Sequence, residues 1–330
     1  MSRKTKFNHI YKLELQTQFC EQNKYLLESF IEYLKSVDKA KSTIEAYYQD
    51  LRLFFCWNVT DNNNKPFTQV TKREFAKFQG KALSDWEWSP NRIRRMKAVL
   101  SSLSNYIENI LDEETEFSGY RSIVRKIENP VNQPVREKTI LTQEELQHLL
   151  DVLVENKQYR QACCLSLAIN SARRKSELTR FKVSYFDEKN VLFDSLYKTP
   201  EKVVTKGRGS KGKLLYLYIL KKPFDPYLKM WLNEREEKGI KSEWLFPKDA
   251  NPNEPVSTDI LDNWGNTFTP ILNKNFYWHC IRHYATTQFV KSNIPSHIIK
   301  GIIGWESVDM VDVYNDLSTD DMLAQYFKEQ

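Results

Sequence analysis

The sequence predicts a mainly α-helical protein of two domains, with a small β-sheet in the second domain. The chain has 330 residues. One hydrophobic core rarely extends past about 250 to 300 residues, so two folding units are expected. Apolar residues recur at helical spacing through most of the chain, whereas strand-like alternation is confined to residues 191–220. This distribution indicates helical domains with a β-rich interruption.

Residues 21–125 are predicted to form a helical first domain. Apolar residues recur at helical spacing near its start: Leu26, Leu27, Phe30, Ile31 and Leu34. Two further helices are predicted to begin at the capping boxes Ser42–Glu45 and Thr71–Glu74. After Pro90, an apolar stripe predicts another helix over residues 91–111.

The predicted helix over residues 91–111 combines an apolar stripe with a basic beginning. Its first turns carry Arg92, Arg94, Arg95 and Lys97. Such a helix can pack by its stripe and contact phosphates with its basic end. If the partner is a nucleic acid, these four residues are expected to bind it.

The composition of the chain also distinguishes an N-terminal segment, a linker and the start of the second domain. Residues 1–20 form a basic N-terminal segment. Residues 126–140 hold two prolines among polar side chains, which is typical of an exposed linker. The second domain is predicted to cover residues 141–330 and to begin with the capping box Thr142–Glu145.

The β-rich part of the second domain is also strongly basic. Residues 191–193 predict a short strand, and residues 202–220 predict a hairpin that turns at Gly207 and Gly209. No acidic residue interrupts residues 202–224, which contain Lys202, Lys206, Arg208, Lys211, Lys213, Lys221 and Lys222. Such a run is either a solvated face or a surface that contacts nucleic acid.

The composition favours a cytoplasmic protein without a membrane role. Hydrophobic residues make up 41% of the chain, and no apolar run approaches the roughly 20 residues that a membrane span needs. The basic N-terminus is followed by no apolar segment, so no secretory signal is expected. The five cysteines form no Cys-x-x-Cys pair, so they are expected to be reduced thiols. A net charge of +6 permits a nucleic-acid partner without establishing one.

Three strings in the second domain carry residues suited to breaking a phosphodiester bond. They are SARRKSEL at Ser171–Leu178, HCIRH at His279–His283 and GIIGWESVDMVDVY at Gly301–Tyr314. Without a metal, such a reaction needs a nucleophile, cations that hold the phosphate, an acid and a base or orienting group. These strings resemble the motifs of the tyrosine recombinase (phage integrase) family. The resemblance covers the chain from Thr142 onward by motif, and the preceding helical region by pattern only.

The resemblance implies a helical core-binding domain, an α+β catalytic domain and a set of catalytic residues. Tyr314 is implied as the nucleophile, which forms a 3′-phosphotyrosyl bond and leaves a free 5′-hydroxyl. Arg174 and Arg282 are implied to clamp the phosphate, and His279 to assist proton removal from Tyr314 or to hold the phosphate. Glu177 follows Arg174 by three residues, so it shares a helical face and is expected to orient that guanidinium.

Alternatives exist for two of these motifs. Arg173 competes with Arg174, but the register of the following Ser-Glu-Leu selects Arg174. His279, Cys280 and His283 contain metal-binding residue types, but no glutamate follows His279 and no distal ligand cluster is evident. No metal and no cofactor are therefore expected, and His283 is expected to have a structural role.

Two positions depart from the usual family pattern. Trp305 stands nine residues before Tyr314, where the family usually has a histidine. An indole N–H only donates, so Trp305 either completes the phosphate pocket without shuttling protons or simply packs as an aromatic side chain. The family's catalytic lysine lies on a β-hairpin, where Lys206 is the best match and Lys211 the second. Arg208 is a further candidate, but arginine is a poor acid.

The motifs together predict a metal-independent, tyrosine-type site-specific DNA recombinase that integrates or excises a mobile element. The resemblance implies double-stranded DNA as partner and a homotetramer on two DNA sites, and it is compatible with accessory DNA-bending or directionality proteins. The expected DNA-binding residues are Arg92, Arg94, Arg95, Lys97, Arg208 and Lys211. The alternatives are a catalytically inactive DNA-binding module of the same fold and a type IB topoisomerase-like relaxing enzyme.

The segment after Tyr314 has apolar residues spaced for an amphipathic helix: Leu317, Met322, Leu323 and Phe327. This helix is predicted to dock on a neighbouring protomer or to pack on its own domain.

Overall fold

The computed structural model describes residues 12–131, 138–207, 209 and 211–318. The chain divides into two compact units, residues 1–137 and residues 138–330, apart from the short segment 208–212. The boundary at residue 137 falls within the segment predicted as a linker. The predicted tail helix beyond residue 318, most of the basic N-terminal segment and Arg208 lie outside the described residues.

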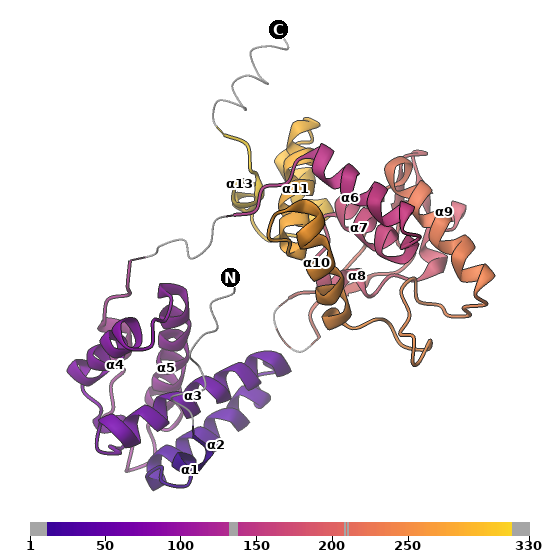
Figure 1. Ribbon diagram of the computed structural model, residues 1–330. Coiled ribbons are helices and arrows are strands. Elements are labelled where there is room, and N and C mark those ends of the chain that lie inside the picture. The colour runs from indigo at the N-terminus through magenta and orange to yellow at the C-terminus, as the bar shows by residue number, and fades with distance from the viewer. Residues whose placement is uncertain (1–11, 132–137, 208, 210, 319–330) are drawn as a thin grey trace. The chain divides into compact units, whose positions relative to one another are not determined.

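The described part of the first unit is helical (Figure 1). Its elements are α1 (Leu13–Gln16), α2 (Glu21–Ser36), α3 (Lys41–Asp61), α4 (Lys72–Ser84) and α5 (Pro90–Ile110), with short 3-10 turns at Phe67–Gln69 and Val124–Lys126. The core is rich in aromatic rings. The Phe54 ring lies 5.4 Å from that of Phe75 and 5.1 Å from that of Phe78, so α3 packs against α4 through these side chains.

The helix starts of this unit can be compared with the predicted capping boxes. The capping box Thr71–Glu74 at α4 is confirmed, and Ser89 caps α5 by accepting a hydrogen bond from the backbone N–H of Arg92. The predicted box at Ser42 is wrong. Ala40 is the last residue before α3 and makes no side-chain cap, so Ser42 already lies within the first helical turn.

A buried carboxylate joins α3 to α5. Asp50 is fully buried, and its Oδ1 lies 2.6 Å from Nη2 of Arg92. Its Oδ2 lies 3.0 Å from Nε of Arg95. Because a buried carboxylate is costly without compensating charge, this arginine pair stabilises the packing of the two longest helices of the unit.

Replacing Asp50 by alanine is expected to lower the free energy of unfolding by about 3 to 5 kcal/mol, because the charge that compensates two arginines is removed. Urea unfolding of the full chain, followed by circular dichroism, measures this effect. Asp112→Ala alters an exposed carboxylate of the same unit and should stay within about 0.5 kcal/mol of the wild type. Equal stability of the two variants would contradict the prediction.

The second unit consists of helices around a central one (Figure 1). The helices are α6 (Gln143–Glu155), α7 (Tyr159–Ser171), α8 (Lys175–Leu178), α9 (Lys221–Glu237), α10 (Thr258–Leu272), α11 (Trp278–Lys291), α12 (Ser296–Ile303) and α13 (Asp309–Tyr314). Helix α7 packs on α6, α9 and α11 and is buried over most of its length. The predicted capping box Thr142–Glu145 at the start of α6 is confirmed.

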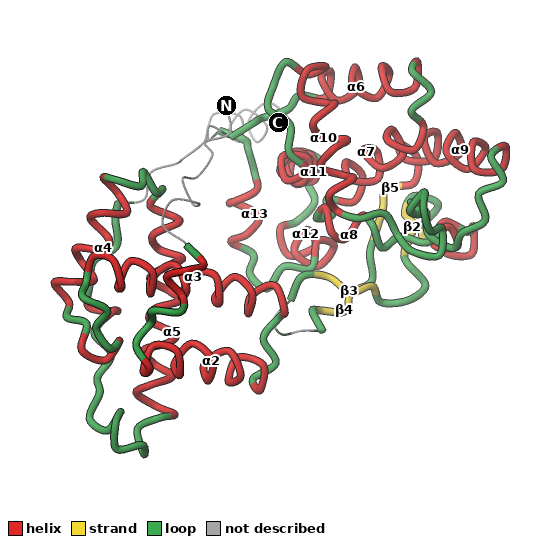
Figure 2. Tube along the Cα trace, turned by 60° about the horizontal axis from the view of Figure 1, so that its bottom comes forward, coloured by secondary structure: helices red, strands yellow, loops and turns green. Residues whose placement is uncertain are grey.

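Two small antiparallel sheets interrupt these helices (Figure 2). Strands β1 (Val191–Leu192), β2 (Leu196–Lys198) and β5 (Tyr218–Leu220) form one sheet, and β3 (Val203–Thr205) pairs with β4 (Lys213–Leu215) in the other. The mainly helical fold with a small β component is confirmed. The single hairpin predicted over residues 202–220 is corrected, because β4 ends at Leu215 and the next strand joins the other sheet. The strand predicted over residues 191–193 is shorter in the structure, because β1 ends at Leu192. Phe193 lies beyond β1 and is 85% exposed.

Within the part of the chain that the structure describes, none of the helices has the length and apolar character needed to cross a lipid bilayer.

Candidate active site

Tyr314 and His279 lie in direct contact although they are 35 residues apart. Tyr314 is the last residue of α13, and its side chain is largely buried, with 8% of the residue exposed. Its hydroxyl lies 2.9 Å from Nε2 of His279 on the second residue of α11. This distance is suited to proton transfer between a nucleophilic hydroxyl and a base.

The pKa of His279 is lowered to about 4. Burial contributes most to this shift, followed by the charges of His283, Arg282, Arg174 and Lys206. The imidazole is therefore neutral at pH 7, and a neutral imidazole has one nitrogen that can accept a proton.

Arg282 lies one turn beyond His279 on α11 and is fully buried. Its Nη1 donates to the carbonyl of Ala172 over 2.8 Å, and its guanidinium lies 5.2 Å from the Trp305 ring and 5.5 Å from the Tyr314 ring. Burial and the charge of Arg174 lower the pKa of Arg282 to about 9.

Several buried donors at this place have no hydrogen-bond partner among the described residues. They are Nε and Nη2 of Arg282 and Nε1 of Trp305. Buried donors without acceptors are costly, so such groups are typical of a ligand site. A phosphate oxygen accepts hydrogen bonds and carries negative charge, which makes it a suitable ligand for this set of donors.

Glu177 connects the two arginines predicted to hold the phosphate. Its Oε1 lies 3.0 Å from Nη1 of Arg174, and its Oε2 lies 4.0 Å from Nη1 of Arg282. It also accepts hydrogen bonds from the backbone N–H groups of Arg174 and Lys206. Burial raises the pKa of Glu177, but the charge of Arg173, the Arg174 N–H group and the remaining charges outweigh burial and hold the pKa below its usual range.

The two adjacent arginines differ in access to solvent. The Arg174 side chain is 25% exposed, whereas Arg173 is buried and donates to the backbone carbonyl of Ile302. Burial lowers the pKa of Arg173 to about 10. Arg174 is thus the one of the pair that an external phosphate can approach.

Trp305 lies against Tyr314. Its ring centroid is 4.9 Å from that of Tyr314, and the residue is buried. It follows Gly304, which ends α12 with a left-handed φ of 81°. The left-handed backbone favours glycine there, and a Cβ at this position would lie 2.1 Å from Cδ1 of Leu215, so that side chain would have to move.

The hairpin of β3 and β4 contacts this site at the two ends of its connecting loop. Lys206 follows β3 and is exposed, and its charge contributes to the lowered pKa of His279. Lys213 on β4 donates to the backbone carbonyl of Gly304 over 3.5 Å. Lys211 is exposed. Lys213 was not among the predicted site residues. Its place in the basic run of residues 202–224 is the only feature of the sequence that indicates a role for it.

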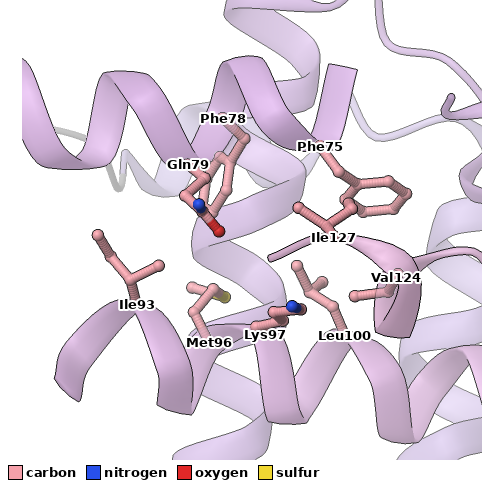
Figure 3. Close-up of a pocket in the computed structure, with 9 residues that line it drawn as sticks. All are labelled: Phe75, Phe78, Gln79, Ile93, Met96, Lys97, Leu100, Val124 and Ile127. Atoms are coloured by element: carbon pink, nitrogen blue, oxygen red, sulfur yellow. The ribbon is translucent and has the colours of Figure 1, made fainter. Parts of the chain in front are cut away.

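The basic residues at the start of α5 have contacts within the first unit. Arg92 and Arg95 contact Asp50, and Arg94 donates to the carbonyl of Pro130 over 2.9 Å. Lys97 lies beside an apolar cavity of about 20 Å³ between α4 and α5 (Figure 3), which has room for about one water molecule. Burial lowers the pKa of Lys97. Contact of these residues with DNA stays a prediction.

Among the described residues, His, Cys, Asp and Glu side chains form no group of three or more that could hold a metal ion. Cys280, between the two histidines of the HCIRH string, is buried, and burial raises its pKa to about 11.

The fold and the grouping of a tyrosine, a histidine and buried arginines point to an enzyme class that the family comparisons identify. Residues 139–320 match the model of the phage integrase family, and residues 26–116 match that of the phage integrase N-terminal SAM-like domain. The chain belongs to the phage integrase family, and its enzyme class is that of the tyrosine recombinases.

Two curated relatives are similar over most of the chain. The SPbeta prophage-derived recombinase-like protein YomM of Bacillus subtilis is 30% identical over 293 residues, which cover 86% of this chain and 84% of YomM. A tyrosine recombinase of Thermosipho africanus is 24% identical over 298 residues, which cover 88% of this chain and 94% of the relative.

Solved structures of the same fold include XerH in a post-cleavage complex with its palindromic difH substrate. It has a TM-score of 0.66 and 17% identity, with 96% of this chain and 87% of XerH covered. A lambda integrase dimer on a core site has a TM-score of 0.63 and 13% identity, with 88% of this chain and 94% of the integrase covered.

Glu177→Gln is expected to lower the free energy of unfolding at pH 7 by about 3 to 5 kcal/mol, because it removes the charge that compensates buried arginines. The lowered pKa of Glu177 in the folded state means that its stabilisation is present above its usual value of 4.5 and is lost as the pH falls through the folded value. Wild type should therefore lose more stability than Glu177→Gln on acidification below pH 4.5.

Urea unfolding between pH 7 and pH 3.5 measures both effects. Glu236→Gln alters an exposed glutamate on α9 and should behave like the wild type. If the free energies of unfolding of wild type and Glu177→Gln changed with pH in the same way, this carboxylate would not compensate the arginines.

The His279 imidazole is expected to titrate near pH 4 in the protein without DNA, because burial and neighbouring positive charge disfavour its protonated form. Proton NMR of the histidine Cε1–H signals, assigned with His279→Asn, measures this value. The exposed His297 provides an internal comparison. A His279 midpoint at or above 6.5 would contradict the described environment.

Proposed function

We propose that this protein cleaves and rejoins duplex DNA at specific sites through a covalent bond between Tyr314 and a DNA phosphate. The observation that carries the proposal is the 2.9 Å contact between the Tyr314 hydroxyl and Nε2 of a neutral His279, beside the buried guanidinium of Arg282. This arrangement pairs a nucleophile with a proton acceptor and a cation.

In the proposed cleavage step, the Tyr314 oxygen attacks the scissile phosphorus while its proton moves to Nε2 of His279. Arg174, Arg282 and the indole N–H of Trp305 hold the phosphate oxygens as charge shifts onto them. The bond to the 5′-oxygen breaks, and Lys206 gives that oxygen a proton. The products are a 3′-phosphotyrosyl bond and a free 5′-hydroxyl.

Rejoining is the reverse of this step. A 5′-hydroxyl of the partner strand attacks the phosphotyrosyl phosphorus and returns its proton to Lys206, and His279 returns a proton to the released Tyr314 oxygen. Because the phosphate ester is exchanged rather than hydrolysed, the reaction requires no nucleotide cofactor.

The proposed biological substrate is the ends of a mobile element, with integration or excision as the event. The similarity to an SPbeta prophage-derived relative supports this choice. Exchange between two duplexes breaks four strands, and each protomer supplies one Tyr314, so the proposed active form is a homotetramer on two DNA sites. A cytoplasmic location and accessory DNA-bending or directionality proteins belong to the same proposal.

A set of overlapping nicked duplexes, which together cover the DNA on either side of the gene, can trap the covalent complex of the protein with cleaved DNA. Wild type is expected to form a denaturation-resistant adduct with one or more of them, and Tyr314→Phe none, because the phenyl ring lacks the attacking oxygen. Denaturing gel electrophoresis with labelled DNA measures the adduct. Tyr227→Phe is the matched control, because Tyr227 lies on α9 and contacts Gln147 rather than the site.

An adduct that persists in Tyr314→Phe would exclude this nucleophile. DNA binding by wild type without any adduct would indicate an inactive binding module. Once a duplex that the protein cleaves is known, recombination between two copies of that sequence distinguishes a recombinase from a relaxing enzyme. A relaxing enzyme changes supercoiling without exchanging the flanking DNA.

A further inference from the structure

One stripe of α11 contacts three different parts of Tyr314. His279 contacts the hydroxyl, His283 stacks on the ring, and Thr287 donates through Oγ1 to the Tyr314 carbonyl over 3.5 Å. These residues follow each other at intervals of four, so they lie on the same face of the helix. The nucleophile is therefore held along one helical face.

Helix α13 cannot fix the nucleophile by itself. It has six residues and ends at Tyr314, and isolated helices of this length are not stable in water. The position of the phenol therefore depends on contacts with side chains of other segments, of which His283 and Trp305 lie against the ring.

His283 makes the closer ring contact. Its centroid lies 4.5 Å from that of Tyr314 with an interplanar angle of 24°, compared with 4.9 Å and 35° for Trp305. A near-parallel ring at this distance restricts the tilt of the phenol, and the tilt sets the direction in which the hydroxyl points.

Asp316 lies beside His283, at a distance longer than a hydrogen bond. Its side chain is 6% exposed, and its Oδ1 lies 3.6 Å from Nδ1 of His283. The backbone N–H of Asp316 donates to Oγ1 of Thr287 over 2.9 Å. Burial raises the pKa of Asp316, but His283 and Lys138 outweigh burial and lower it, so this carboxylate is charged at neutral pH.

Lys138 anchors this carboxylate to the first described residues of the second unit. It forms an ion pair with Asp316. The neighbouring Thr139 donates through its N–H to the Tyr277 hydroxyl over 3.3 Å and through Oγ1 to the carbonyl of Asn275 over 2.8 Å. Asp316 and the residue next to Lys138 therefore both contact α11 or the residues just before it.

We propose that His283 is a positioning residue that aligns the Tyr314 phenol for attack, and that Asp316, paired with Lys138, holds the His283 ring against it. The inference rests on the proposed function, since it assigns His283 to the alignment of that nucleophile. It goes beyond the sequence-based expectation of a structural role for His283.

Two substitutions separate the ring contact from the carboxylate contact. His283→Ala removes both, and His283→Phe keeps a planar ring while removing Nδ1. At saturating nicked duplex, His283→Ala is expected to lower the single-turnover cleavage rate by about 10- to 100-fold, because small displacements of a nucleophile cost up to about that factor. The DNA dissociation constant should change by less than about 3-fold, since His283 touches the nucleophile rather than the DNA-facing donors. His283→Phe should recover at least half of the loss on a logarithmic scale.

Asp316→Asn tests the second part of the proposal. It is expected to lower the cleavage rate by about 3- to 10-fold in wild type and to have little further effect in His283→Ala, because contacting residues act together. Asp312→Asn and His297→Ala change an exposed carboxylate and an exposed imidazole of the same unit and should leave the rate unchanged.

A wild-type cleavage rate in His283→Ala would overturn the inference while leaving the proposed function intact. So would a loss of DNA affinity as large as the loss of rate, which would indicate general unfolding. Loss of rate in His283→Phe as great as in His283→Ala would exclude ring stacking as the cause. If wild type itself forms no adduct, the proposed function fails and the inference fails with it.

Discussion

The carboxylate of Glu177 lies buried among the guanidinium groups of Arg173, Arg174 and Arg282. Burying an arginine without a compensating charge is costly, and this site buries two of them almost completely. One negative charge shared among three positive ones leaves the cluster with a net positive charge, which favours an anion. In the proposed function, a phosphate beside these arginines completes the compensation that Glu177 provides only in part, so that binding and catalysis draw on the same electrostatic imbalance.

Burial and the same positive charge together determine the state of the histidine beside it. His279 is neutral because it is partly buried and because protonation would add a further cation to this cluster. His283 and Trp305 lie against the Tyr314 ring. Tyr314 thus lies close to the guanidinium of Arg282 and to the rings of His283 and Trp305.

Local motifs predicted which of the candidate residues lie close together, whereas contacts between distant segments could not be predicted. His279 and Arg282 share a face of α11 through a spacing of three, as the sequence indicates. Arg174 is instead the extended N-cap residue of α8, and Glu177 reaches it from the third position of that helix, so the predicted shared helical face is corrected. Asp316 and Lys138 are 178 residues apart, and neither belongs to a recognisable string. Asp50 likewise lies 42 residues from Arg92, so the sequence did not show that a buried acid engages the basic end of α5. The division of the hairpin after Leu215 depends on which sheet each strand joins, a tertiary choice that alternation does not encode.

The lack of a side chain at Gly304 links two parts of the site that perform different tasks. Leu215 occupies the space where a Cβ would lie, and Lys213 on the same strand binds the Gly304 carbonyl. The hairpin that carries Lys206 and the turn that carries Trp305 consequently share one tightly fitted junction. The left-handed backbone at residue 304 favours glycine whatever residue stands at 215, and a shift at this junction moves the strand pair beside Lys206 and the turn that holds Trp305 together.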